Sequence, residues 1–555
     1  MQDRSPTRTD VVILGSGLAG SIAALCLRRR GFEVVLADQG THPRFALGES
    51  TTTPASLWLR VLSRTFDVPE LLNLASAEAL TRNVAATSGI KNNFGYLYHP
   101  EGAARPSHAW QAIIPQAFLT DHGLDRMAPE NEMHYFRQDV DAYLWASALR
   151  AGAVGRPAMQ VAEMAIDDEG VRLRTEAGET IEARFVIDAS GHRSPVARHL
   201  GLREETPRMR THSRSLFTHM IGVRPYEDAK LVPDSMAAWS HGTLHHFFDG
   251  GWVWVIPFNN HPGSTNRLCS VGVNFDHRRF PRREGLSPED EWREFLAAHP
   301  SIAVQFENAT PVRPWIQTDR LQYSSRACVG NRFWMTAHSA GAVDALYSMG
   351  NINTFHTLAV ALPLIASALE EDDLRRERLE PVERLTDALL RFQDRIVCGS
   401  YAGSRAPEML RVWIALWSLT DTARIRKVLM PLVRHVRTGD PKDLADCLSD
   451  PADIVTGVGM QTGITDAATV LDELDGLCDI MAELEHEGSS LAEVSQRLNH
   501  AIESKERYGI NLGEMDYAFS KIPWLFEPLA RNGLRCHATC FLTPYEMQTL
   551  GTGQT

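Results

Sequence analysis

The first forty residues alternate between short apolar runs and one helical stretch. Residues 10–14 form a β-branched run, residues 21–30 carry apolar side chains at helical spacing, and residues 32–37 form a second apolar run. Short β-branched runs predict strands, and the 3.6-residue spacing between them predicts a helix. The N-terminal segment therefore predicts the strand, turn, helix and strand that begin an α/β domain.

Later patterns extend this prediction. Residues 139–151 have the spacing of a helix, and residues 184–188 form a strand that ends in Asp188-Ala-Ser-Gly. Residues 371–545 show helical periodicity and little strand pattern, most clearly over 374–395 and 467–484. The chain thus predicts an α/β N-terminal part and a helical C-terminal part.

One apolar stretch bears on membranes. The run at 358–369 is interrupted by Pro363 and is shorter than the roughly 20 residues that span a bilayer. The N-terminus, MQDRSPTRTD, lacks the apolar segment and small-residue cleavage site of a secretory signal. We therefore expect a cytoplasmic protein without membrane attachment.

The turn after the first strand has the spacing of a dinucleotide site. Gly15 permits the tight turn, Gly17 lets the backbone approach a pyrophosphate, and Gly20 allows close packing of the following helix. Asp38, at the end of the second apolar run, is expected to bind the two ribose hydroxyls. The strand, turn, helix and acidic residue together predict one dinucleotide.

FAD is favoured over NAD because of three further features. The strand that ends in Asp188-Ala-Ser-Gly is typical of the last strand of flavoprotein nucleotide domains. The segment 45–54, with Glu49 and Ser50, points the same way, and Arg137 is a candidate contact to the flavin's chain. A second glycine-rich stretch, 457–463, has no preceding strand and no acidic residue at ribose distance, so we interpret it as a loop.

Length, charge and cysteine content narrow the class. With 555 residues the chain is long enough for about three packed units. A net charge of −13 argues against nucleic acid or an anionic membrane as a partner. The eight cysteines are scattered, so we expect no disulfides and a reducing compartment. Only six of the 56 basic residues are lysines, which makes each lysine more informative.

The segment Gly250-Gly-Trp-Val-Trp-Val-Ile-Pro257 predicts a strand with Trp252, Trp254 and Ile256 on one face, ended by Pro257. Combined with the nucleotide motif, it resembles the Trp-x-Trp-x-Ile-Pro motif of flavin-dependent halogenases. In that family the tryptophan strand is thought to separate the flavin from the substrate. Ser88-Gly-Ile-Lys91-Asn-Asn-Phe-Gly-Tyr96 is similar to the family's stretch with the catalytic lysine, and Lys91 is the only lysine in the first 229 residues.

The resemblance implies a reaction. Reduced FAD and oxygen give a flavin hydroperoxide, chloride attacks its terminal oxygen, and the resulting hypochlorous acid moves through the protein to Lys91. The lysine then orients the oxidant or becomes a chloramine beside the substrate. A separate flavin reductase is the implied partner, because the chain shows a single dinucleotide site.

A third segment, residues 337–351, matches the family's flavin and halide segment in part. The family's Gly-Asp pair is replaced by Ala337-His338, which removes a carboxylate from the ribityl chain and predicts weaker or altered flavin binding. The resemblance implies flavin contacts at Ala340 and Gly341. It implies a chloride site at the backbone N–H groups of Ser348, Met349 and Gly350.

These matches imply a discontinuous Rossmann-like FAD domain of the aromatic-hydroxylase type. We expect FAD-binding residues 1–84, 132–200 and 320–370, a substrate-side sheet of residues 85–131 and 201–319, and a helical domain of residues 371–555. No metal is expected: Cys536, His537 and Cys540 are too few ligands for a structural zinc, and His245-His246 and Asp443/Asp446 lack partners at suitable spacing.

Three functions remain open at this point. The first is a halogenase of antibiotic or other secondary metabolism, the second is a single-component FAD aromatic hydroxylase, and the third is a non-catalytic binder of a biosynthetic intermediate or carrier protein. Tryptophan-acting halogenases carry a glutamate immediately before a Ser-Thr-Gly, whereas Tyr347 occupies that position here. A phenol needs less help from a carboxylate, so we expect chlorination of an electron-rich phenolic ring of a polyketide-like product. A pyrrole on a carrier protein is the nearest alternative.

Overall fold

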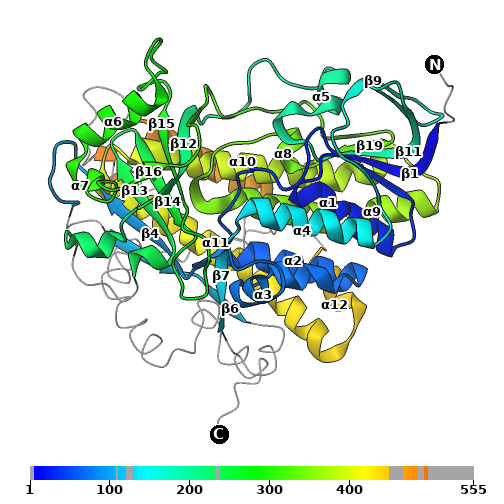
Figure 1. The fold of residues 1–555 in the computed structure, drawn as a ribbon, viewed down its shortest axis with the longest axis horizontal. Coiled ribbons are helices and arrows are strands. Elements are labelled where there is room, and N and C mark those ends of the chain that lie inside the picture. The colour runs from blue at the N-terminus through cyan, green and yellow to red at the C-terminus, as the bar shows by residue number, and fades with distance from the viewer. Residues whose placement is uncertain are drawn as a thin grey trace, which may run out of the picture.

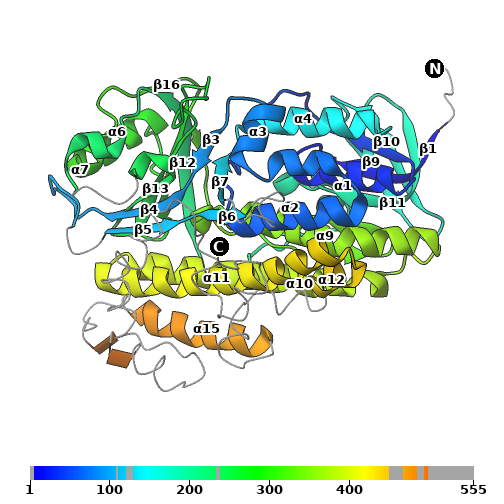
Figure 2. The same cartoon turned by 90° about the horizontal axis from the view of Figure 1, so that it is seen from below.

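The computed structural model describes residues 6–107, 111–119, 129–232, 238–448 and 467–483, together with 493–494 and 496–497. Two large sheets lie at opposite ends of the molecule, and a layer of long helices runs along both (Figures 1 and 2). The glycine-rich stretch at 457–463 and the cysteines at 536 and 540 lie outside the described residues.

The first sheet has the order β18-β19-β11-β1-β2-β8, with β10 and β9 continuing from β11. Its parallel strands are β1 (Thr7–Leu14), β2 (Val34–Ala37), β8 (Val154–Arg156), β11 (Thr180–Asp188) and β19 (Phe333–Met335). Three strands pair antiparallel: β9 (Val161–Ile166), β10 (Val171–Thr175) and β18 (Val329–Gly330). The buried β-branched runs explain the parallel core, and the α/β class is confirmed.

Helices cover this sheet. α1 (Leu18–Arg29) begins at the glycine turn and packs against α4 (Arg137–Arg150) and α9 (Met349–Glu370). The helices α2 (Thr53–Phe66), α3 (Ala77–Asn83), α5 (Pro195–His199) and α8 (Ala337–Ala340) complete this part. α4 begins at Arg137, two residues earlier than the pattern predicts.

The helix α9 differs from the expectation for its apolar run. Residues Leu346–Glu370 form a stretch with a mean hydropathy of 1.5 in its most apolar window, long enough to cross a membrane by composition. Because the helix accommodates Pro363 without ending, it is longer than the run at 358–369 suggested. Most of that window is buried, against α1, α2 and α10. α9 is a core helix of this fold.

The second sheet has the order β16-β12-β15-β14-β13-β4-β5, with β17 beside β12. Its strands are β4 (Asn93–Tyr98), β5 (Gln111–Pro115), β12 (Ser213–Ile221), β13 (Thr243–Phe248), β14 (Gly251–Pro257), β15 (Cys269–Asp276), β16 (Thr310–Pro311) and β17 (Ile316–Gln317). All pairs are antiparallel except β13 with β4. α6 (Pro288–Ala298) and α7 (Pro300–Ala303) pack at its outer end (Figure 1).

A small sheet links the two large ones. It consists of β3 (Gly89–Lys91), β7 (Pro129–His134) and β6 (Ala117–Leu119), paired in that order. In the antiparallel pair of β3 and β7, Lys91 lies opposite Glu132. This pairing decides what surrounds the predicted catalytic lysine.

The C-terminal layer contains α10 (Glu380–Gly403), α11 (Pro407–Thr438), α12 (Pro441–Asp446) and α15 (Ala467–Ala482) (Figure 2). α10 begins six residues after the predicted start at 374, because residues 376–379 form a 3₁₀ turn and Pro381 suits the first turn of the helix. α10 continues eight residues beyond the predicted end at 395. The predicted helix at 467–484 is confirmed over its described length.

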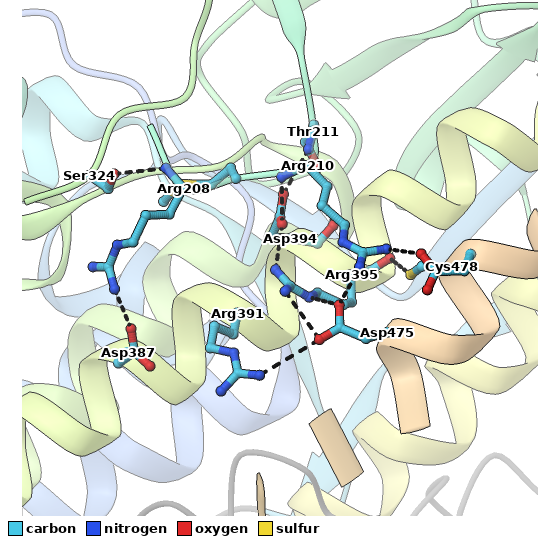
Figure 3. Close-up of polar contacts among 12 residues, drawn as sticks. Arg208, Arg210, Thr211, Ser324, Asp387, Arg391, Asp394, Arg395, Asp475 and Cys478 are labelled. Atoms are coloured by element: carbon cyan, nitrogen blue, oxygen red, sulfur yellow. Dashed lines mark hydrogen bonds and ion pairs between the residues drawn. The ribbon is translucent and has the colours of Figure 1, made fainter. Parts of the chain in front are cut away.

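A buried carboxylate fixes the orientation of α10. Asp394 accepts hydrogen bonds from the backbone N–H groups of Arg210 (2.8 Å) and Thr211 (2.9 Å) (Figure 3). Arg395 pairs with Asp475 of α15 at 2.6 Å, and the side chain of Arg210 pairs with the same carboxylate. These contacts join the segment before β12 to α10 and α15. They fix the position of α10, which carries Leu390 and Gln393 into the wall of the cavity described below.

Candidate functional site

A cavity of about 800 Å³ lies between the glycine turn, the tryptophan strand β14 and α10. At one end it is lined by Gly17 and Arg44, and at the other by Trp252, Trp254 and Gln393. Of the predicted site residues, those that line it are Gly17, Glu49, Ser50, Arg137, Trp252, Trp254, Ile256, Gly341, Ser348 and Gly350. Residues from three predicted motifs therefore share one cavity.

The glycine turn has the geometry that a pyrophosphate requires. Gly15 has a φ of +100°, and a Cβ there would lie 2.5 Å from the carbonyl oxygen of Ala189. A Cβ on Gly20 would lie 1.8 Å from the oxygen of Gly15, so the helix can pack here only with glycine. Gly17 faces the cavity, and a Cβ on it would meet no neighbouring atom closer than 3.7 Å, which leaves room for a phosphate at the N-terminus of α1.

Asp38 lies beside the turn rather than on the cavity wall. Its carboxylate accepts hydrogen bonds from the N–H and the hydroxyl of Ser16 at 2.7 and 2.9 Å, and it pairs with Arg44 at 2.9 Å. The backbone N–H groups of Ser16 and Gly40 and the Arg44 charge hold the pKa of Asp38 below its usual value, against the effect of burial. The ribose contact predicted for Asp38 stays a prediction.

Arg137 is a buried cavity residue and not a surface cap. Asp141 holds its guanidinium through two hydrogen bonds of 2.8 and 3.0 Å, and Arg137 also donates to the carbonyl oxygens of Leu47 and Gly48. The guanidinium thus joins α4 to the segment with Glu49 and Ser50. Glu49 in turn contacts His219 of β12, with 2.6 Å between Oε1 and Nε2.

Three predicted residues of β14 line the cavity. Trp252 and Trp254 lie on one face with ring centroids 5.8 Å apart, and Ile256 continues that face. The indole of Trp254 lies across Gly272, where a Cβ would approach it to 2.2 Å, and its N–H donates to Ser270 at 3.2 Å. The tryptophan wall is therefore fixed by packing from β15.

Pro257 lies outside the main cavity. It lines a second cavity of about 410 Å³ on the other face of the sheet. Its carbonyl oxygen contacts Nδ1 of His134 at 2.9 Å. The end of the tryptophan motif is thus connected to β7.

Lys91 is fully buried and lies behind two cavity residues. Its ammonium donates to Ser50 Oγ at 2.8 Å, to the carbonyl oxygen of Thr51 at 2.7 Å and to Ser348 Oγ at 3.4 Å. Its Nζ also lies 3.5 Å from the centre of the Phe94 ring. Burial lowers the pKa of Lys91 well below its ordinary value, and the carboxylates of Glu132 and Asp421 offset part of that effect.

Those two carboxylates are functional candidates that sequence reasoning missed. Glu132 is buried on β7 and accepts hydrogen bonds from Thr51 and Ser56, both at 2.9 Å. Burial raises the pKa of Glu132 to about 7, and burial raises that of Asp421 on α11 to about 6, although Arg424 and Lys91 favour its charged form. No motif identifies either residue, because β-pairing and helix packing bring them to Lys91.

The predicted halide segment lies at the N-terminus of α9. Tyr347 and Ser348 both have left-handed backbone conformations, with φ of +67° and +55°. This turn places Ser348 and Gly350 on the cavity wall at the start of the helix, where the first N–H groups lack helical partners. Met349 is buried and does not line the cavity.

Tyr347 is not available as a base. It is fully buried, its hydroxyl lies 2.7 Å from Ser400, and its ring stacks on Trp417 at 4.4 Å. Burial raises its pKa above the ordinary value. The position before Ser348 therefore supports packing.

His338 lines the cavity next to the halide segment. Its Nδ1 lies 3.1 Å from Thr354 Oγ1, and its Nε2 would lie 3.0 Å from a Cβ on Gly350. The substitution of the Gly-Asp pair therefore places an imidazole against the start of α9. Ala340, the last residue of the same helix α8, is buried, and Gly341 lines the cavity.

No group of three or more metal-binding side chains occurs within the described ranges. His245 stacks on Tyr96 at 4.8 Å, and His246 contacts His99 and Gln305. Asp443 and Asp446 both pair with Arg434.

Several known proteins are similar to this chain. A model of the tryptophan halogenase family matches residues 10–274. The chain is 40% identical over 435 residues to the tetracycline 7-halogenase of Kitasatospora aureofaciens, which covers 78% of this chain and 76% of that protein. It is 42% identical over 446 residues to the monodechloroaminopyrrolnitrin halogenase PrnC of Pseudomonas fluorescens, covering 80% and 76%. The crystal structure of the halogenase PltM in complex with phloroglucinol and FAD superposes with a TM-score of 0.81 at 31% identity, covering 90% of this chain and 96% of PltM.

Proposed function

The chain belongs to the tryptophan halogenase family, and on that premise we propose that it chlorinates an electron-rich phenolic ring of a polyketide-like intermediate. As a member of the family it is a flavin-dependent halogenase, an oxidoreductase that uses FAD, chloride and oxygen. Its relatives named for tetracycline and pyrrolnitrin belong to antibiotic biosynthesis.

The residues of the cavity fit FAD. The open side of Gly17 and the N-terminus of α1 suit the pyrophosphate, and Arg137 can donate to the chain that joins it to the ring. Trp252 and Trp254 form a wall between the cavity and the interior of the second sheet. Bound reduced FAD supplies, with oxygen and chloride, the oxidised chlorine as hypochlorous acid.

Lys91 receives the oxidant in this proposal. Ser348 lines the cavity, and its Oγ lies 3.4 Å from Nζ of Lys91, so it connects the chloride segment to the lysine. Because burial lowers the pKa of Lys91, a larger share of the side chain is the neutral amine that can attack the chlorine atom. The ammonium form can instead orient hypochlorous acid by hydrogen bonding.

The proposed substrate class rests on the burial and packing of Tyr347. A packed tyrosine occupies the position before Ser348-Met349-Gly350, so this segment offers no carboxylate for an unactivated indole carbon. A phenol activates its own ortho and para carbons through its oxygen. PltM, whose structure contains phloroglucinol, a phenol, supports the same class.

The test compares phenols and polyphenols with free tryptophan, using a flavin reductase, FAD, oxygen and chloride, with products identified by mass spectrometry. We expect monochlorinated phenols, ortho or para to the hydroxyl, and none without chloride or with Lys91→Ala. Efficient chlorination of tryptophan with phenols left unchanged contradicts the proposal. A pyrrole presented on a carrier protein is the second substrate to include.

The partners follow from the same reasoning. One glycine turn with a following acidic residue supports a single dinucleotide site, so a separate reductase would supply reduced FAD. A cytoplasmic location stays a prediction from the sequence.

A further inference from the structure

A continuous line of hydrogen bonds leads away from Lys91. Its ammonium donates to Ser50 Oγ at 2.8 Å, Ser50 Oγ lies 2.9 Å from Thr243 Oγ1, and Thr243 Oγ1 lies 3.0 Å from Nε2 of His134. The four residues come from β3, the loop before α2, β13 and β7. All four are buried, with no more than 9% of any of them exposed. The line therefore runs through the interior from the lysine to one imidazole.

The carbonyl oxygen of Pro257 sets the direction of every proton in this line. Since that oxygen can only accept, Nδ1 of His134 carries the hydrogen in their 2.9 Å contact. The neutral ring then has a lone pair on Nε2, so the hydroxyl of Thr243 must donate to it. Thr243 in turn accepts from Ser50, and Ser50 accepts from Lys91. Each donor points away from the lysine.

His134 is neutral, so its Nε2 is free to accept a proton. Burial, and then the charge of Lys91, lower the pKa of His134 to about 3, so the ring is neutral while the lysine is protonated. Once a proton leaves Lys91, the repulsion from its charge disappears and His134 becomes more basic. Among the described residues, the other ionisable groups that interact electrostatically with the lysine are Glu132, Asp421 and His245.

Glu132 is the alternative acceptor, and its contacts do not provide a path. Its hydrogen bonds come from Thr51 and Ser56, whereas Lys91 contacts the carbonyl oxygen of Thr51, which cannot pass on a proton. Within the described residues, hydroxyl groups connect Lys91 to His134 and not to Glu132.

We propose that Ser50, Thr243 and His134 form a proton relay that takes a proton from the Lys91 ammonium and so frees its amine for hypochlorous acid. The inference rests on the proposed role of Lys91. In the first step one proton moves at each link, leaving a neutral amine on Lys91 and a proton on Nε2 of His134. The amine nitrogen then bonds to chlorine as the O–Cl bond breaks, and the departing hydroxide takes an amine proton to form water.

The second half of the cycle also balances. A ring carbon of the substrate bonds to chlorine as the N–Cl bond breaks, and the ring proton returns to the amine. The proton held by His134 can then return along the same line. Ser50 and Thr243 also line the main cavity, whereas His134 lies behind them. In this proposal Thr243 and His134 act on the reaction through Lys91, so they are positioning residues.

The decisive variants keep the shape of the line and remove its chemistry. His134→Gln retains an acceptor for Thr243, but an amide does not take up a proton. Thr243→Val removes the hydroxyl and keeps the volume, and Thr243→Ser restores the hydroxyl. The matched controls change a buried threonine and a buried histidine outside the line. They are Thr218→Val in β12 and His99→Gln, directly after β4.

The first readout needs no organic substrate. Full-length enzyme with reduced FAD, oxygen and chloride is passed through a desalting column, and the oxidising equivalents kept by the protein are titrated with thionitrobenzoate. Lys91→Ala gives the background. The rate at which these equivalents appear should fall about 10²-fold in His134→Gln and Thr243→Val, within the range for positioned proton transfer. Thr243→Ser should recover most of the rate, and peroxide release should not change in any variant.

A second readout is single-turnover chlorination of a phenol by the same variants. Wild-type rates in His134→Gln would overturn the relay, because a purely structural histidine is replaced by its hydrogen-bonding isostere without loss. Equal losses in Thr243→Val and Thr243→Ser would overturn it as well. If the wild-type enzyme holds oxidising equivalents but chlorinates no phenol, the substrate proposal fails and the relay is still tested by the first readout.

Discussion

Glu132→Gln tests how the environment of Lys91 is built. Burial raises the pKa of Glu132 from its ordinary value of 4.5 to about 7, even though Ser56, Thr51 and Lys91 all favour the carboxylate. Its Oε1 has no hydrogen-bond partner among the described residues. A buried carboxylate with one unpaired oxygen costs stability when it is charged.

The size of this stability loss follows from the pKa of Glu132 in the unfolded and in the folded state. Below pH 4.5 the carboxyl is protonated in both the folded and the unfolded state, so it has no effect on stability. Between 4.5 and about 7 the unfolded state releases the proton and the folded state keeps it, so stability falls as pH rises. At about 1.4 kcal/mol per pH unit, the complete loss above pH 7 is at most about 3 kcal/mol.

Glutamine keeps the shape of Glu132, can accept from Thr51 and Ser56, and stays neutral. We therefore expect Glu132→Gln to match the wild type near pH 5 and to be up to about 3 kcal/mol more stable near pH 8. The loss of a carboxylate near Lys91 offsets part of this gain. The measurement is thermal unfolding followed by tryptophan fluorescence across that pH range.

The matched control is Glu291→Gln. Glu291 is also buried, but it pairs with Arg214 at 2.6 Å, so its replacement should destabilise the protein by about 3 to 5 kcal/mol. If Glu132→Gln instead unfolds at a lower temperature than the wild type near pH 8, the reasoning is refuted, and Glu132 is a structural hydrogen-bond partner.

The same variant predicts a change in activity. Because the charge of Glu132 raises the pKa of Lys91, its removal should enlarge the share of neutral amine above about pH 7, where the wild-type carboxyl is ionised. The chlorination rate of the variant should then exceed that of the wild type above about pH 7 and match it at lower pH. A rate that falls equally at every pH would show that Glu132 does not act through the ionisation of Lys91.

Three further outcomes follow from the site. Lys91→Ala should remove chlorination while FAD binding and peroxide release stay near wild type, and Lys91→Arg should also fail because a guanidinium that stays protonated cannot form the same chloramine; normal product from either variant would exclude the lysine. With FAD and NADH alone the enzyme should be inactive until a flavin reductase is added, and rapid reduction of its flavin by NADH would contradict the single dinucleotide site. Arg137→Ala should weaken FAD binding by about 10- to 100-fold in a fluorescence titration, the loss expected for a charged hydrogen-bond donor, whereas Arg150→Ala, on the exposed end of the same helix, should not.

The sequence predicts those parts of the site that depend on local geometry. The glycine turn requires glycine at 15 and 20 because a Cβ would overlap neighbouring backbone atoms, and such a requirement is visible in a motif. The strand with Trp252 and Trp254 follows from alternation, and the structure places both rings on the predicted face. Glu132 and His134 carry no such signal. They come near Lys91 through the register of β3 with β7, and β4, β5 and β6 lie between these two strands in the chain, so no local spacing reports the pairing.

Helix ends and polar partners were the least predictable features. Asp38 has the expected position at the end of β2, yet Ser16 and Arg44 occupy its oxygens, which no spacing rule reports. α10 starts at Glu380 because a 3₁₀ turn precedes it and Pro381 lies in its first turn, although the apolar spacing begins earlier. Tertiary contacts thus decide the partners of Asp38, and local chain geometry decides the start of α10.

The environment of Lys91 is difficult to explain by stability alone. Burial lowers the pKa of the lysine and raises those of Glu132 and Asp421, so each of the three groups is less stable in its charged form than it would be in water. Apolar side chains of similar size would remove that cost. What the arrangement does provide is several protonation states of similar free energy around one amine, with His134 connected to it by hydroxyl groups. The proposed reaction needs Lys91 as a neutral amine while the oxidant is held beside it. Protonation states of similar free energy around the lysine allow this.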